Sequence, residues 1–115
     1  MKDDHVYLAH VRDAIARIEQ FTSGGRDEFF TTPMVQDAVI RNLEIIGEAV
    51  KVLSESLRLA NPDIPWKQMA GMRDVLIHHY FGVKLETVWQ VVAGHLPNLR
   101  DRVQLLLAES QSESG

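Results

Sequence analysis

The stretch MVQDAVIRNLEIIGEAVKVLSESLRL, residues 34–59, decides the fold because its pattern is that of one long helix. It contains no proline and a single glycine, Gly47, and its apolar side chains recur at spacings of three and four residues. At 1.5 Å per residue the helix would be about 37 Å long. We predict that it is the spine of the domain, beginning after Pro33 with Thr31 or Thr32 as its cap and ending before the segment NPDIP, residues 61–65.

The segments on either side of this spine also favour helices. Residues 6–21 have the amphipathic period of a first helix, with Asp3 or Asp4 as its candidate N-cap and the glycine-rich segment TSGG, residues 22–25, at its end. Residues 27–30 form at most one short helical turn. Residues 66–80 predict a further helix, continuous or interrupted at Gly71, followed by a turn at residues 81–83.

The last apolar segment, residues 85–108, predicts a helix that Pro97 either kinks or divides in two. The polar residues 109–115 are expected to form a disordered tail. No stretch alternates polar and apolar residues as strands do. The sequence therefore predicts a single all-α domain, residues 1–108, built as a four- to five-helix bundle in which Trp66 and Trp89 pack the bundle or a dimer face.

The composition limits the class of protein. With 115 residues, 45% hydrophobic and 24% charged, the chain has the balance of one folded domain. It has no cysteine, which excludes disulfides and thiolate metal sites. The N-terminal segment MKDDHVYLAH lacks the apolar core of a signal peptide and no apolar run is long enough to span a membrane, so a cytoplasmic location is expected. The net charge of −4 argues against a broadly basic nucleic-acid-coating protein, but it permits a local basic site.

Chemically versatile residues gather in one short segment, MRDVLIHHYFGV, residues 72–83. On an ideal helix Arg73 and Tyr80 lie on nearly the same face, and Asp74 and His78 are four residues apart and able to pair. Arg73 and His78 are five apart, about 140° around the axis, so helix geometry neither requires nor forbids their cooperation. From these residues alone, both a catalytic site and the polar edge of a core helix remain open.

The segment resembles the Arg-x4-His-x-Tyr signature of the HepT-like branch of the HEPN superfamily. Three more segments are similar to that family in the same order: RNLEIIGEAVKVLSE at residues 41–55, NPDIPWKQMAGMRD at residues 61–74, and VWQVVAGHLPNL at residues 88–99. Together the similarity covers roughly residues 5–108. Lys84 departs from the family pattern, because relatives commonly carry an acidic residue there.

The resemblance implies a function. It implies a metal-independent endoribonuclease, without cofactor, that is the toxin of a type II toxin–antitoxin pair and acts as a homodimer with two motifs facing each other across a cleft. It assigns catalysis to Arg73 and His78, and makes Tyr80 the residue to which a minimal nucleotidyltransferase antitoxin adds AMP to block the enzyme. The residue types suit this chemistry, because histidine exchanges protons near neutral pH and arginine binds phosphoryl oxygens with a permanently charged fork of donors.

Four other residues are supporting candidates. Asp74 either orients His78 or is simply a solvated carboxylate. Glu44 and Glu48 lie four apart on the spine, where either would restrain Arg73 or His78. Neither has a histidine at a matching position, so no metal site is predicted. His79 lies about 100° around the helix from His78 and is expected at the surface or the edge.

Two other functions stay open on the sequence. The first is a non-catalytic HEPN-like module that binds nucleotide or RNA with the same residues. The second is a helical partner subunit of a nucleotidyltransferase in which the motif is incidental. The RNA that an active enzyme would cleave is not named by any residue of the chain.

Overall fold

The computed structural model describes residues 2–78 and 84–114. Over these residues the regular elements are all helical, which confirms the predicted all-α class. In chain order they are α1 (Lys2–Phe21), α2 (Arg26–Thr31), α3 (Pro33–Val52), α4 (Glu55–Ala60), α5 (Trp66–His78), α6 (Leu85–Gln90), the π-helical segment η2 (Val91–His95) and α7 (Leu96–Ser114). The turn expected at residues 81–83 lies outside the described residues.

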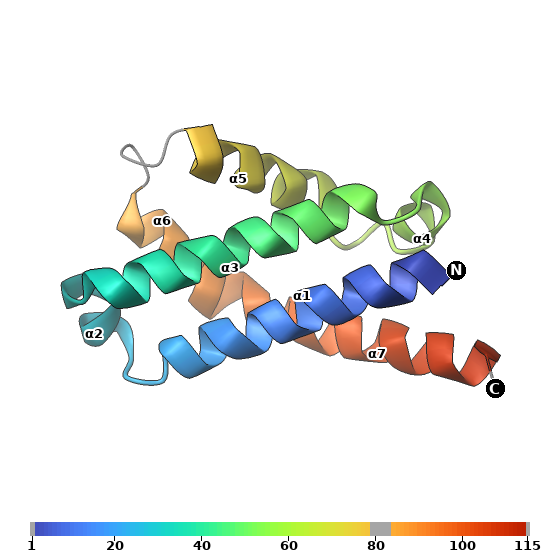
Figure 1. The fold of residues 1–115 in the computed structure, drawn as a ribbon, viewed down its shortest axis with the longest axis horizontal. Helices are drawn as coiled ribbons and strands as arrows, with labels where there is room; N and C mark the ends of the chain where they lie inside the picture. The colour runs from blue at the N-terminus through green and yellow to red at the C-terminus, as the bar shows by residue number, and fades with distance from the viewer. Residues whose placement is uncertain (1, 79–83, 115) are drawn as a thin grey trace.

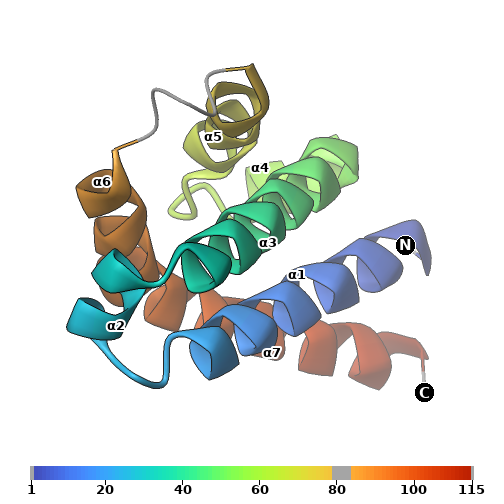
Figure 2. The same cartoon turned by 60° about the vertical axis from the view of Figure 1, so that its left-hand side comes forward.

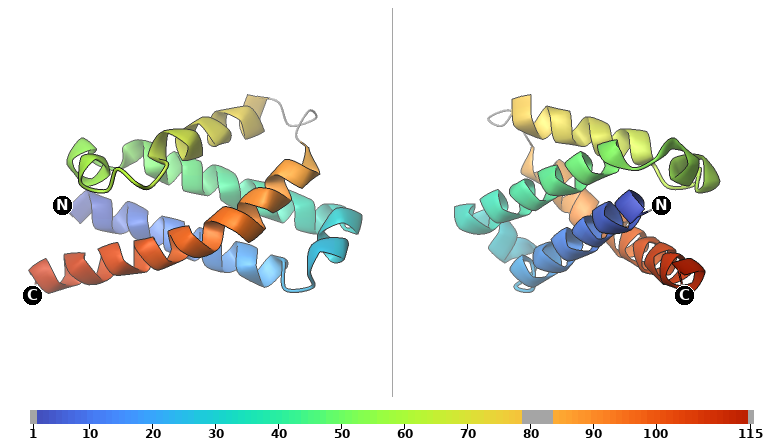
Figure 3. Two further views of the ribbon diagram at one scale, coloured as in Figure 1. Left: turned by 180° about the vertical axis from the view of Figure 1, so that it is seen from behind. Right: turned by 45° about the vertical axis from the view of Figure 1, so that its right-hand side comes forward.

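Helix α3 is the centre of the bundle. It packs on α1 along one side and on α5 along the other, and it runs antiparallel to both (Figure 1). In the view turned by 60°, α5 lies above α3 and α6 lies to the left of it (Figure 2). From behind, α6, η2 and α7 form one long run that crosses the bundle and packs on α1 (Figure 3). The molecule measures 46 × 27 × 20 Å, and the predicted spine is its middle layer.

The core lies mainly between α1, α3 and α7. Phe29 of the short helix α2 is fully buried and its ring centre is 5.4 Å from that of Trp89, which confirms that this tryptophan packs the bundle. Among the described side chains of α5, only Trp66 and Leu76 are buried, so this helix is more peripheral than α1 or α3. The largest fully buried side chains share the period of three and four residues seen in the sequence: Leu8, Val11, Ile15 and Ile18 of α1, Val39, Leu43, Ile46 and Val50 of α3, and Val103 of α7.

The predicted spine is shorter than expected. Instead of one helix over residues 34–59, α3 ends at Val52, two extended residues follow, and α4 begins at Glu55. The cause is Asp4, a buried carboxylate from α1 that accepts hydrogen bonds from the Ser54 amide at 2.7 Å and from its hydroxyl at 2.5 Å. Ser54 Oγ in turn accepts from the Leu57 amide and caps α4. A tertiary contact between residues fifty positions apart therefore overrides local helix propensity.

The helix starts also differ in detail from the prediction. Helix α1 begins at Lys2, so Asp4 lies within its first turn, and its carboxylate accepts from Ser54, the N-cap residue of α4. Thr32 does occupy the N-cap position of α3, with Pro33 at the first helical position, although its side chain makes no capping hydrogen bond. Helix α5 continues through Gly71 without a break.

The C-terminal run is divided just before Pro97 by the five residues of η2. Proline has no amide hydrogen to donate, so it interrupts the hydrogen bonds of an α-helix. A π-helical turn is one way for the chain to accommodate this interruption. The tail from Glu109 was expected to be disordered, but α7 continues through it as far as Ser114. No glycine or proline interrupts the helix there, and each added residue contributes one more helical hydrogen bond. None of the helices in the described ranges is long and apolar enough to cross a membrane.

Candidate functional site

Arg73 lies on α5 where this helix passes very close to Gly47 of α3. A Cβ atom built on Gly47 of α3 would lie 2.2 Å from Arg73 Cβ and 3.1 Å from the carbonyl oxygen of Met69. Only a residue without a side chain allows the two helices to approach so closely. The single glycine of the spine therefore sets the depth at which Arg73 sits against α3.

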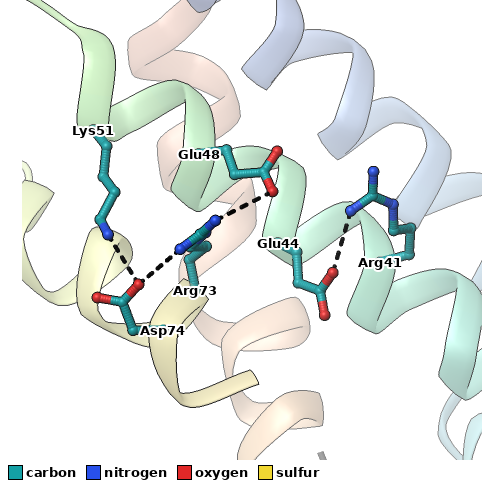
Figure 4. Close-up of polar contacts among 6 residues, drawn as sticks. All are labelled: Arg41, Glu44, Glu48, Lys51, Arg73 and Asp74. Atoms are coloured by element: carbon teal, nitrogen blue, oxygen red, sulfur yellow. Dashed lines mark hydrogen bonds and ion pairs between the residues drawn. The ribbon is translucent and has the colours of Figure 1, made fainter. Parts of the chain in front are cut away.

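The guanidinium group of Arg73 is held by carboxylates from two helices (Figure 4). Its Nη1 donates to Asp74 Oδ1 at 3.0 Å, and its Nη2 lies 3.7 Å from Glu48 Oε1 of α3. The third nitrogen, Nε, is buried and has no hydrogen-bond acceptor within the part of the chain that the structure describes. The side chain is 28% exposed, so part of the guanidinium faces solvent in a restrained orientation.

Asp74 links Arg73 to a second cation. Lys51 of α3 donates to the same Oδ1 atom at 2.9 Å, so two cations and the two carboxylates of Asp74 and Glu48 alternate across the α3–α5 contact. The hydrogen bond from Lys51, and after it the one from Arg73, lowers the pKa of Asp74 below its usual range. Asp74 is therefore ionised at neutral pH and bridges Arg73 and Lys51. Its expected contact with His78 lies outside the side chains that the structure describes.

The two glutamates of α3 have different partners. Glu48 faces Arg73, as described, but Glu44 forms an ion pair with Arg41 at 3.3 Å on its own helix. Figure 4 shows Glu44 and Glu48 directed to different cations. Of the two glutamates proposed to restrain Arg73, the structure brings only Glu48 into contact with it.

His78 is the last residue of α5, five positions after Arg73 and about 7.5 Å further along the helix axis. Its main chain is helical and belongs to the described residues. His79 and Tyr80 lie outside them. The structure therefore defines the arginine half of the predicted motif and the helix that carries His78.

Lys51 is the member of this cluster that sequence reasoning missed. A signal was available, because Glu44, Glu48 and Lys51 follow one another at helical spacings of four and three, with Gly47 next to Glu48, and so share a face of α3. Arg73 keeps solvent-facing donors while its position is constrained by Gly47 and two carboxylates. Such a restrained guanidinium can bind the oxygens of a phosphate diester.

Comparison with known proteins adds an independent finding. Residues 11–106 match the model of a family described as Ribonuclease HepT-like. The chain is 43% identical over 108 residues to the probable ribonuclease HepT of Thermococcus cleftensis, covering 92% of this chain and 98% of that protein. It is 38% identical over 112 residues to a putative RNase of Caldanaerobacter subterraneus, covering 96% and 100% of the two chains.

A third relative is longer. The chain is 45% identical over 109 residues to the gamma-glutamylcyclotransferase and putative RNase of Methanocaldococcus jannaschii. The match covers 94% of this chain but only about half of that relative, 49%. No solved structure matches significantly.

Proposed function

This chain belongs to the ribonuclease HepT-like family and is thus a ribonuclease of the HEPN type, and we propose that it cleaves RNA internally through Arg73 and His78. The observation that carries the proposal is the restrained guanidinium of Arg73, held against Gly47 by Glu48 and Asp74 on the helix that ends at His78.

The chemistry proposed uses protein side chains and the 2′-hydroxyl of the RNA itself. A base removes the proton of a ribose 2′-hydroxyl, the 2′-oxygen bonds to the adjacent phosphorus, and the bond from phosphorus to the 5′-oxygen breaks. An acid gives a proton to that departing oxygen, which leaves a 2′,3′-cyclic phosphate and a 5′-hydroxyl. His78 is suited to the proton transfers and Arg73 to the charge that grows on the phosphoryl oxygens.

Two chains would complete the site. On an ideal helix Arg73 and His78 point about 140° apart, and each chain supplies one motif histidine where the reaction needs both a base and an acid. A two-fold homodimer supplies two. The pairing would also cover a hollow of about 240 Å³ between α5 and the α6–η2 run, where the side chain of Val75 is 53% exposed. Its lining is mainly apolar, with one lysine and one threonine: Met72, Val75, Leu76, Lys84, Thr87, Val88 and Val91.

Cleavage of a labelled single-stranded RNA by the purified protein tests the proposal. We expect products with 2′,3′-cyclic phosphate ends in the presence of EDTA, and no cleavage where the 2′-hydroxyls are absent. Arg73→Ala and His78→Ala should each lower kcat by at least 100-fold. The exposed residues Arg17 and His10 of α1 provide matched controls, as Arg17→Ala and His10→Ala.

The outcomes separate the candidate functions. If the folded parent binds RNA but does not cut it, the chain is the binding module and the catalytic assignment is wrong. Equal activity of parent, Arg73→Ala and His78→Ala would also reject the assignment. Light scattering of the parent at several concentrations tests the dimer, which a monomeric active species would overturn.

We further propose that the enzyme is the toxin of a toxin–antitoxin pair and that Tyr80 accepts AMP from a minimal nucleotidyltransferase antitoxin. This proposal rests on the similarity of residues 72–83 to the family signature. A bulky anion added two residues after His78 would occupy the space of an RNA phosphate and repel it. Co-expression with such a transferase should raise the intact mass by one or more AMP units. An unchanged mass, or the same increase in Tyr80→Phe, contradicts the assignment.

A further inference from the structure

A second concave surface lies beside Arg73. Helix α4, the loop of residues 61–65 and the first turn of α5 surround an open hollow of about 920 Å³. The hollow reaches the last turn of α3 at Lys51 and extends along α5 as far as Ala70. We refer to it as the α4–α5 hollow.

Three cations from three helices line the α4–α5 hollow: Lys51 of α3, Arg58 of α4 and Lys67 of α5. Lys51 is bound to Asp74, as described above. Arg58 and Lys67 have no carboxylate partner among the side chains that the structure describes, those of residues 4–76 and 84–109, and Arg58 Nε is buried without an acceptor there. These two cations are therefore available to an anion.

The acidic residues of the hollow do not cancel this charge. Asp63 is engaged by Arg102 of α7, and that hydrogen bond lowers the pKa of Asp63. Glu55 is the other carboxylate on the lining. With Lys51 and Asp63 each neutralised by its own partner, Arg58 and Lys67 face one free carboxylate and leave a net positive charge on a chain whose total charge is −4.

The walls of the hollow are braced. Asn61 accepts at its carbonyl oxygen from Trp66 Nε1 at 3.0 Å, and its side-chain oxygen accepts from Arg102 Nη2 at 3.1 Å. The loop is thus tied both to α5 and to α7. Apolar surface borders the cations: Leu59 is 70% exposed, and Pro62 also lines the hollow. Such surfaces offer contact to the faces of unpaired bases, while cations bind the backbone.

The hollow is continuous with the surroundings of Arg73. Lys51 belongs to both, since its ammonium group contacts Asp74, which accepts from Arg73. Along α5, Lys67 and Arg73 are six residues apart, a rise of about 9 Å. Lys67 and Arg73 are also about 120° apart around the axis, so Lys51 is the contact through which the two regions adjoin.

We infer that the α4–α5 hollow is a subsite for the backbone of single-stranded RNA next to the cleaved bond, with Arg58 and Lys67 binding its phosphates. The inference rests on the proposed ribonuclease function and extends it to the strand beyond the reacting phosphate. The occupant is a polyanionic strand because the free cations come from two different helices and stand beside apolar surface.

The test is the double variant Arg58→Gln/Lys67→Gln, compared with Arg12→Gln/Arg17→Gln on the exposed face of α1, which removes the same charge elsewhere. Binding of a fluorescent 12-nucleotide single-stranded RNA is measured by anisotropy in the His78→Ala background, at several salt concentrations. We expect Kd to rise about 10-fold, and the salt slope to fall by about 1.4 because each lost phosphate contact on a single strand removes about 0.7. In the active protein KM should rise more than kcat falls, and Arg58→Lys should restore part of the binding.

The results distinguish this inference from the proposed function. If the parent cleaves RNA and the two double variants bind and cleave alike, the subsite is wrong and the ribonuclease stands. If the parent does not cleave, but only Arg58→Gln/Lys67→Gln weakens RNA binding, the subsite stands and the catalytic proposal fails. A parent that does not bind RNA overturns the subsite. Circular dichroism of each variant confirms that the fold is retained.

Discussion

The close approach of α3 and α5 makes Gly47→Ala the most informative single substitution. The new Cβ would lie 2.2 Å from Arg73 Cβ, whereas carbon atoms in ordinary contact are about 3.5–4.0 Å apart. The helices must therefore separate or tilt locally by more than 1 Å, on the order of the shortfall. Arg73 Cβ is attached directly to the backbone of α5, so no side-chain rotation relieves this contact.

Two opposing effects determine how much Gly47→Ala changes the free energy of unfolding. Overpacking costs about 1–3 kcal/mol, and replacing a glycine within a helix by alanine returns up to about 1 kcal/mol. We expect Gly47→Ala to lower the free energy of unfolding by about 1–2 kcal/mol. Gly71→Ala is the matched control, because a Cβ there meets nothing within 4 Å and only the favourable effect, up to about 1 kcal/mol, remains.

Thermal unfolding measures the loss of stability, and RNA cleavage measures the effect of displacing Arg73. The two alanine variants should differ in Tm by about 8–12 °C, at roughly 4 °C per kcal/mol for a domain of this size. Because Arg73 moves with α5, kcat of folded Gly47→Ala should fall by about 10- to 100-fold, as expected for a misplacement of about 1 Å. Equal stability and equal activity of the two variants would refute the argument that Gly47 positions Arg73.

Three further predictions follow from contacts elsewhere. Asp4→Ala should lower the free energy of unfolding in urea by about 2 kcal/mol, because it leaves the Ser54 amide unpaired; Ser54→Ala should itself cost about 1 kcal/mol because Ser54 caps α4, the double variant should lose less than the sum of the two single losses, and additive losses would argue against the pairing. The pKa of Asp74 lies below the ordinary 3.8, so the ionised carboxylate contributes stability above that pH, and the contribution is lost as pH falls through the lowered value. Carbon NMR should show Asp74 titrating below 3.8 and moving toward 3.8 in Lys51→Met, and no shift in that variant would contradict the assigned cause. Phe29→Ala should cost about 3–5 kcal/mol in urea unfolding, since its ring is fully buried against the α6 segment, and a loss below 1 kcal/mol would be inconsistent with that burial.

Much of the fold could be predicted because the deciding signals are local. Apolar spacing located α1 and most of α3, the glycines at residues 24–25 located the end of α1, and Pro33 located the start of α3. The break between α3 and α4 could not be found in this way, since it depends on the carboxylate of Asp4, which meets Ser54 only after α1 has packed on α3. The π-helical turn was also missed, because its register depends on which side chains the two flanking helices bury.

The candidate site, too, was predictable only where the signals are local. Arg73 and Glu48 were named from the motif and the helix period, and the structure brings them together. The contact between Asp74 and Lys51 was not predictable from the helix that carries Asp74, because Lys51 reaches it from α3. His79 and Tyr80 remain predictions from the sequence, and so do the catalytic roles of Arg73 and His78.

The π-helical segment η2 has a consequence for how the chain can change in length. A π turn holds one residue more than an α turn, and each residue of an α-helix advances about 100° around the axis. Deleting one of the exposed residues Ala93 or Gly94 would convert η2 to an ordinary α turn and keep the present rotation of α6 relative to α7, because the residue removed is the extra one of the π turn. Val88 would stay in the core and Trp89 would stay beside Phe29. The same deletion within the regular part of α7 would instead rotate one part of the run against the other by about 100°. The segment η2 is therefore the place where this run of helices can lose one residue without losing its apolar face.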